Sequence, residues 1–303
     1  MTTPTAPPAE HRDPASDHAR GRANAGPQTL VEKLWEQHRI DAFDAQTDLM
    51  SIDRVILHER SGALALRALS DDGRTVANPE QVYATVDHVL DTTPGRTDST
   101  RIPGGQEFIQ VFREEARARK ITLFDVGDEE QGISHVVSAE QGLALPGTTL
   151  VCADSHTGTL GGLGALAWGV GNTDIEHALA TGTVVARRPA SMRVIFNGTL
   201  NPYVTAKDMM LHLIAVIGAG GAAGHAIEFC GSAIRALPIE ARLTLCNMAV
   251  ECAAWTGLVA PDQTTLDYLQ NRPYAPTGAA WERAVQDWKQ LTSDPGAHFP
   301  RDV

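Results

Sequence analysis

The feature that most constrains this fold is a regular alternation of short apolar runs with amphipathic helical segments. Strand candidates occur at 83–90, 121–127, 148–155 and 192–198, and helical patterns lie between them. Strands that alternate with helices predict an α/β fold with a mainly parallel sheet. Such a sheet binds its ligands at the carboxyl ends of its strands. Candidate chemistry is therefore sought where each strand pattern ends.

The domain organisation follows from where the composition and the pattern change. Residues 1–28 are rich in Pro, Ala and charge and lack the apolar centre of a signal peptide, so we expect a disordered tail. Thr29 is the expected N-cap of the first helix. A later helix is expected over 173–186, and another is expected to begin after its N-cap Thr205 and to stop at Gly218. A first α/β domain is expected over 29–200 and a second over 201–303.

The charge and the cysteine usage limit the partners and the compartment. The net charge is −12 and the pI is about 5.3, which argues against nucleic acid or an anionic membrane surface as the main partner. No run of about 18 apolar residues occurs, so no membrane span is expected. We expect a cytoplasmic protein whose 4 cysteines are reduced thiols rather than a disulfide framework.

Two polar groups follow strand patterns directly. Asp87 and His88 precede a loop rich in Gly and Pro, and a carboxylate beside an imidazole keeps it protonated, as an acid for a departing hydroxyl requires. An unremarkable surface pair is the alternative. Asp154, Ser155 and His156 place an acceptor, a hydroxyl and an imidazole on one turn. The glycines that follow predict close approach of backbone N–H groups to an anion.

Two further residues are candidates because of their apolar surroundings. His135 lies in GISHVV, which we interpret as a strand, where a lone histidine is more often a satisfied core residue than a catalyst. Glu228 lies in the apolar segment GHAIEFCG, and a buried glutamate is costly unless it is paired or bound to a metal. A buried ion pair is the simpler explanation for it.

Three other signals carry little weight. The run from Gly218 to Gly224 looks like a dinucleotide fingerprint but follows a helix rather than a strand. Cys246 and Cys252 do not share one helix face, so buried thiols are favoured over a metal pair. Ser155 and His156 lack the nucleophile elbow of a hydrolase.

Taken together, these motifs resemble the aconitase superfamily, and most closely the isopropylmalate dehydratase large subunits. The resemblance covers about 29–265 in the family's order, and its most specific stretches are QGISHVVSAEQGLALPGTTLVCADSHTGTLGGLGALAWGVG and RLTLCNMAVECAAWTGLVAPDQTT. It implies aconitase-like α/β/α domains with mainly parallel sheets, truncated relative to the family.

The resemblance also implies an activity and a role for each candidate residue. The family removes water from a hydroxylated di- or tricarboxylic acid and adds it back, with a [4Fe-4S] cluster as Lewis acid. Ser155 and Thr157 are expected to bind substrate, and Glu228 resembles a glutamate near the labile iron. The expected catalytic residues are Asp87, His88, His135, Asp154 and His156.

The sequence departs from the family at the cluster. The family's cluster cysteines belong to a later domain, and none of the cysteines at 152, 230, 246 and 252 matches them. We therefore expect this chain to bind no cluster alone, or to hold an alternative divalent metal. The substrate-binding arginines and the base of the small subunit are also missing.

Three interpretations remain open. The first is a hydro-lyase subunit whose cluster ligands come from a cysteine-bearing partner chain and whose base comes from a small subunit. The second is a cluster-free descendant, a homo-oligomer that performs isomerisation, hydration or decarboxylation on a small carboxylic acid. Its metal would be held by Glu228 and histidines. The third is a non-catalytic truncated paralogue, which the intact polar motifs disfavour, because a remnant has no physical reason to retain costly buried charges.

Overall fold

The computed structural model describes residues 26–303, so residues 1–25 of the expected tail lie outside the described part. The backbone N–H of Gln28 already donates to Asp294, at 2.9 Å. The helices are α2 (Leu30–His38), α3 (Glu59–Asp71), α4 (Gly105–Ala118), α5 (Ser134–Glu140), α6 (Asn172–Thr181), α7 (Ala206–Ile217), α8 (Ser232–Arg235), α9 (Ile239–Asn247), α10 (Gln263–Leu269) and α11 (Gly278–Trp288), with 3-10 turns η2 (Pro79–Gln81), η3 (Thr157–Leu163) and η4 (Met248–Cys252).

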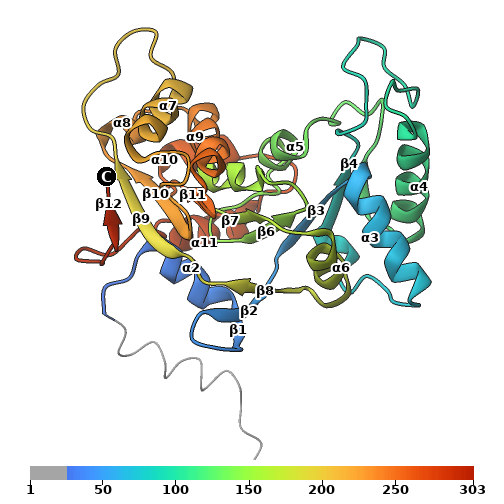
Figure 1. Cartoon of the computed structure of the whole chain (residues 1–303), viewed down its shortest axis with the longest axis horizontal. Helices are drawn as coiled ribbons and strands as arrows, with labels where there is room; N and C mark the ends of the chain where they lie inside the picture. The colour runs from blue at the N-terminus through green and yellow to red at the C-terminus, as the bar shows by residue number, and fades with distance from the viewer. Residues whose placement is uncertain (1–25) are drawn as a thin grey trace, which may run out of the picture.

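The larger sheet is entirely parallel, as the alternation of strands and helices predicts. Its order is β5 (Thr122–Phe124), β4 (Val82–Thr85), β3 (Arg54–His58), β6 (Thr149–Cys152) and β7 (Leu166–Gly169). Figure 1 shows α3 and α4 beside the β3–β4 end of this sheet. The chain is therefore an α/β protein with mainly parallel strands.

A second parallel sheet is built from the later part of the chain, in the order β11 (Thr256–Leu258), β10 (His225–Cys230), β9 (Ala190–Ile195) and β12 (Arg301–Asp302). A third sheet, β1 (Arg39–Ala42), β2 (Thr47–Ser51) and β8 (Thr183–Arg187), is antiparallel. The division of the chain at residue 200 stays a proposal; β9, which ends at Ile195, pairs within the second sheet.

Local signals account for several helix ends. Thr29 accepts a hydrogen bond from the backbone N–H of Glu32, and the Glu32 carboxylate accepts one from the N–H of Thr29, which completes a capping box. At α7 the Asp208 carboxylate accepts both the backbone N–H and the hydroxyl of Thr205, and Gly218 ends that helix with a positive φ of 81°. These caps confirm the helix starts expected at both positions.

Three local expectations were wrong: two in where an element ends and one in the type of element. The strand expected over 83–90 ends at Thr85, which leaves Asp87 and His88 in the loop that follows it. The helix expected over 173–186 ends at Thr181, because Gly182 takes up a left-handed conformation and strand β8 begins. GISHVV is not a strand, since Ser134 begins helix α5.

The glycine-rich turn contains two glycines that allow close packing between segments. A Cβ at Gly161 would lie 1.8 Å from the carbonyl oxygen of Gly257, and one at Gly162 would lie 2.8 Å from the backbone nitrogen of Leu243. These glycines therefore let η3 pack against β11 and α9. Their close backbone approach is to the second part of the chain, and the expected approach of N–H groups in this turn to an anion stays a prediction.

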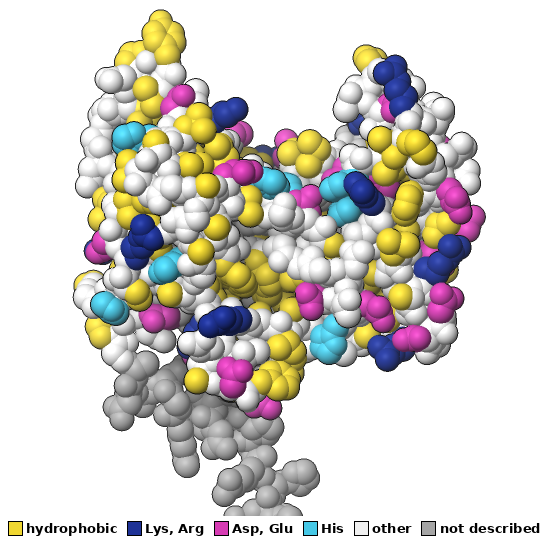
Figure 2. All heavy atoms as spheres, viewed as in Figure 1, with side chains coloured by type: hydrophobic (Ala, Val, Ile, Leu, Met, Phe, Trp, Pro, Cys, Tyr) yellow, Lys and Arg dark blue, Asp and Glu magenta, His cyan; other side chains and the backbone are white. Residues whose placement is uncertain are grey.

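The two parts of the molecule enclose a hollow. Figure 2 shows histidine and acidic side chains on the floor between two raised lobes, which Figure 1 identifies as the α7–α8 side and the α4 side. Among residues 26–303, no helix is long and apolar enough to cross a membrane.

Candidate active site

The candidate site lies where the strand order of the larger sheet reverses. From β3 the chain continues to β4 on one side, whereas from β6 it continues to β7 on the other. Such a switch point leaves a crevice at the carboxyl ends of the strands. His58 ends β3, Asp87 follows β4 and Asp154 follows β6, so three separate segments deliver polar side chains to one place.

The Asp154 carboxylate is the centre of this group. It is contacted by His88 Nε2 at 3.1 Å and by His135 Nε2 at 3.1 Å, and it accepts the backbone N–H of His156 at 2.7 Å. Burial acts to raise the pKa of Asp154, but the hydrogen bonds from His135 and His88 outweigh it and the pKa falls well below its usual range. Asp154 therefore stays ionised, and its carboxylate holds the rings of His88 and His135 in place.

His88 is held between two carboxylates. Its Nε2 contacts Asp154, and its Nδ1 lies 2.5 Å from Asp87 Oδ1. These hydrogen bonds, first that to Asp154 and then that to Asp87, raise the pKa of His88 to about 10. The imidazole is consequently a cation at neutral pH. Asp87 is itself positioned by the backbone N–H of Ser134, at 2.7 Å from its other oxygen.

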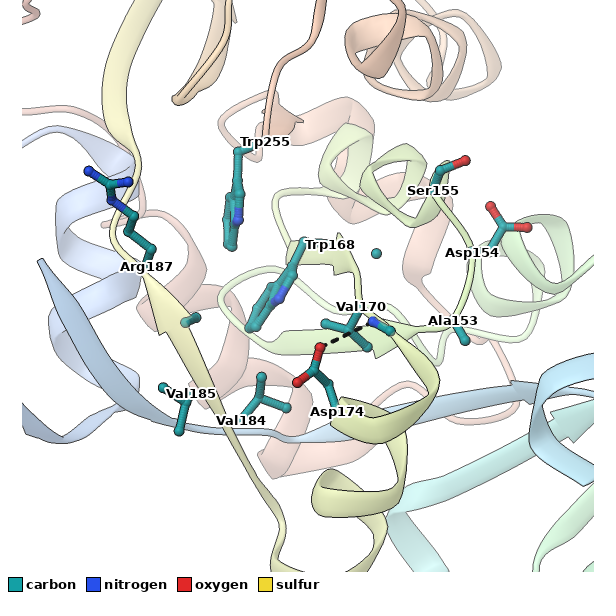
Figure 3. Close-up of a pocket in the computed structure, with 13 residues that line it drawn as sticks. Ala153, Asp154, Ser155, Trp168, Val170, Asp174, Val184, Val185, Arg187 and Trp255 are labelled. Carbon is teal, nitrogen blue, oxygen red and sulfur yellow. Dashed lines mark hydrogen bonds between the residues drawn. The ribbon is translucent and has the colours of Figure 1, made fainter. Parts of the chain in front are cut away.

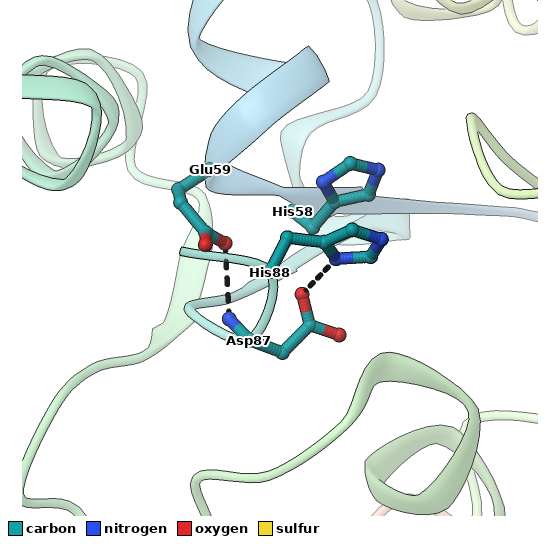
Figure 4. A group of neighbouring side chains, drawn as sticks. All are labelled: His58, Glu59, Asp87 and His88. Carbon is teal, nitrogen blue, oxygen red and sulfur yellow. Dashed lines mark hydrogen bonds and ion pairs between the residues drawn. The ribbon is translucent and has the colours of Figure 1, made fainter. Parts of the chain in front are cut away.

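His58 and Glu59 also belong to this group, although the sequence reasoning missed them. The His58 ring stacks on His88 with centroids 3.7 Å apart, and burial, followed by the nearby His88, lowers the pKa of His58 (Figure 4). Glu59 accepts the backbone N–H groups of Asp87 and Val89. The signal was present in VILHE, where His58 ends a strand and Glu59 follows it, much as Asp87 follows the next strand.

In the turn formed by residues 154–157, some side chains are exposed and others are buried. Ser155 is exposed, and His156 Nε2 lies 3.1 Å from Glu251 Oε1, which extends from η4. Thr157 is fully buried, and its hydroxyl donates to the carbonyl of Asp154 at 2.6 Å. Substrate binding by Thr157 stays a prediction without an exposed surface to support it. Glu251 was missed because its segment carries no local sign of a site.

His135 reaches the site from helix α5 rather than from a strand. It is the second residue of that helix, and its ring points to Asp154 while Val137 and Ser138 are buried. The expectation that His135 is an active-site histidine therefore gains a geometric basis, although its proposed context in a strand was wrong.

Glu228 does not join these side chains. It lies within β10, is 5% exposed, and accepts the hydroxyl of Ser293 at 2.5 Å. Burial raises its pKa, and the Ser293 hydrogen bond only partly opposes this. Within residues 26–303 the hydrogen bonds and ion pairs give its carboxylate no histidine partner. Its role near a metal stays a prediction.

The cysteines do not fit an iron–sulfur cluster. Cys152, Cys246 and Cys252 are buried, Cys230 is half-buried, and burial raises the pKa of each thiol. In the described part of the chain, the residues that come close enough to hold a metal ion are His58, Glu59, Asp87 and His88. That set offers nitrogen and oxygen but no thiolate, so the donors that a cluster requires are not assembled here.

Comparison with known proteins places this arrangement in a wider group. Residues 32–303 match the aconitase family (aconitate hydratase). The chain is 50% identical over 275 residues to the 3-isopropylmalate dehydratase large subunit 1 of Bradyrhizobium diazoefficiens, an alignment that covers 91% of this chain. The same alignment covers 57% of that relative, so the chain spans little more than half of its length.

Proposed function

Because this chain belongs to the aconitase family, we propose that it forms the acid–base wall of a hydro-lyase active site. The substrate class is a hydroxylated di- or tricarboxylic acid. The relative from Bradyrhizobium diazoefficiens is named for 3-isopropylmalate, which makes that compound the first to test. The observation that carries the proposal is the position of His88 between Asp87 and Asp154.

In this proposal His88 is the acid. Its raised pKa keeps it protonated at neutral pH, and the Nε2 contact of 3.1 Å to Asp154 is looser than the Nδ1 contact of 2.5 Å to Asp87. A substrate hydroxyl at the Nε2 edge receives that proton as its carbon–oxygen bond breaks, and water leaves. Asp87 keeps the ring oriented, and Asp154 stabilises the charge.

The remaining parts of the reaction are assigned to other residues. A base must remove a proton from the neighbouring carbon as the double bond forms, and we place that base on a small subunit. The cysteines of a cluster would come from residues outside this sequence or from a cysteine-bearing partner chain. The family's cluster would supply a Lewis acid for the hydroxyl and a carboxylate when it is bound.

A second candidate function is favoured by the cysteine-free donor group. His58, Glu59, Asp87 and His88 have ligand atoms within 4.8 Å of one another. A divalent cation at this group would support a cluster-free acid–base enzyme acting on a small carboxylic acid, with the chain as a homo-oligomer. Both Glu59 oxygens already accept backbone N–H groups, which makes this the weaker candidate.

The experiment is an anaerobic purification from the native host, followed by native mass spectrometry and a dehydration assay. Loss of water from a hydroxylated dicarboxylate creates a conjugated double bond that absorbs in the ultraviolet. A complex that contains a cysteine-bearing partner, the mass of a cluster and this activity would support the hydro-lyase. An active homo-oligomer without iron would favour the second candidate. An inactive, partner-free chain would overturn both.

A further inference from the structure

A pocket of about 440 Å³ is lined in part by the turn that carries Asp154. Its walls are formed by residues 153–155, by the end of β7 with Trp168, by residues 184–187 of β8 and by Trp255. Figure 3 shows the two indoles side by side between β8 and the turn that carries Asp154. The volume lies in the range of small-molecule sites.

Both indoles of the pocket wall carry an N–H donor that no residue of the described part accepts. Trp168 is 3% exposed and stacks on Trp255 with ring centroids 5.0 Å apart, so the faces of the rings are covered. Neither indole N–H has an acceptor among residues 26–303, and neither nitrogen is sealed from solvent. Trp35 behaves differently, because its Nε1 donates to Asp48 at 2.6 Å. An indole nitrogen is a donor only, so a ligand at this pocket must provide acceptors.

The positive charge at the rim agrees with an acceptor that is anionic. Arg187 donates to the side chain of Gln46 at 2.6 Å, and its charge is one of the smaller causes that lower the pKa of Asp44, but it forms no ion pair within 4.0 Å in the described part of the chain. The two lining carboxylates are already engaged: Asp154 by its histidines, and Asp174 by the backbone N–H of Gly171 at 3.2 Å. The unused guanidinium N–H groups suit a carboxylate.

We propose that this pocket binds a carboxylate of the substrate remote from the reacting hydroxyl, held by the indole N–H groups of Trp168 and Trp255 and by Arg187. The identification of the ligand as the substrate rests on the proposed function. The geometric reason is that Asp154 and Ser155 line the pocket and also belong to the turn that carries the histidine cluster.

The test is a titration of the 303-residue chain with malate. The readout is the set of indole N–H resonances of its 5 tryptophans in a ¹H–¹⁵N spectrum. We expect the Trp168 and Trp255 resonances, assigned with W168F and W255F, to shift together. Each Phe variant keeps an aromatic side chain, smaller than the indole, and removes one donor to a charged group, so the dissociation constant should rise about tenfold. Arg187→Gln should raise it similarly, whereas W281F on α11 should leave it unchanged.

Other outcomes overturn the inference in identifiable ways. If malate leaves both resonances unmoved, or if W168F and W255F bind it as the unaltered chain does, the pocket is not a carboxylate site. If inorganic phosphate shifts the same resonances as strongly, the pocket recognises anions in general. Turnover that needs His88 but ignores Trp168 would refute this inference and preserve the proposed function. Malate binding that needs Trp168, in a chain with no hydro-lyase activity, would refute the function and preserve the pocket.

Discussion

Asp154 and Glu228 are both carboxylates set among apolar strands, yet they differ in everything that matters for chemistry. Asp154 lies just after β6, at the switch point of the larger sheet, and is shared by His88 and His135. Glu228 lies within β10, and its carboxylate is satisfied by Ser293 in a sealed environment. The comparison teaches that a buried acid indicates a site only where the backbone ends a strand and leaves room for a ligand.

The largest effect that would sharpen this comparison is on catalysis. His88→Gln removes the proton that we assign to the departing hydroxyl, so kcat/KM of the active complex should fall by about 10²- to 10⁴-fold. The variant should still fold, although it loses the stability that protonated His88 contributes. His212→Gln, an exposed histidine on α7, is the matched control and should retain full activity. A His88→Gln enzyme with full activity would contradict the catalytic role that we assign to the Asp154 region.

The counterpart on the Glu228 side is an effect on stability. Glu228→Ala leaves the hydroxyl of Ser293 without its acceptor and opens a cavity within β10, which should lower the free energy of unfolding by about 1–3 kcal/mol. Glu228→Gln retains an acceptor and should cost less. Denaturant unfolding measures both. A Glu228→Gln variant that folds normally but loses all activity would contradict the purely structural interpretation.

A smaller expected effect is that the stability contributions of the two regions depend differently on pH. The pKa of His88 is raised from 6.5 to about 10, so its contribution to stability is fully present below pH 6.5 and is lost as the pH rises to about 10. The difference in melting temperature between the unaltered chain and His88→Gln should therefore shrink across that range. The pKa of Glu228 is raised by burial, so stability should fall as the pH rises from 4.5 through its folded value, and Glu228→Gln should abolish that fall. If the difference in melting temperature between the unaltered chain and either Gln variant does not change with pH, the direction assigned to that pKa shift is contradicted.

The smallest effect concerns the turn that positions Asp154. Thr157→Val removes the hydroxyl that donates to the Asp154 carbonyl, which should cost about 1 kcal/mol of stability. Because Thr157 is buried, the main effect should be on stability, and KM should change little. Thr181→Val, whose exposed hydroxyl donates to the backbone of His177, is the control for a removed hydroxyl. A large rise in KM with unchanged stability would instead place Thr157 against the substrate.

The sequence by itself determined the local part of this molecule. Periodicity gave the parallel α/β class, and capping residues gave the starts of α2 and α7, because both depend on neighbours within a few residues. The placement of Asp87 and Asp154 after strands was readable for the same reason. The depth of Cys246 and Cys252 also followed from their apolar segments.

Only the tertiary structure decided which of these residues meet. The strand order places His58 beside His88, turns His135 toward Asp154 from α5, and brings Glu251 to His156 across 95 positions of the chain. It likewise assigns the glycines of η3 to packing against β11. Such contacts depend on how distant segments cross, and no pattern within a short window carries that information, because the packing free energy belongs to the assembled sheets.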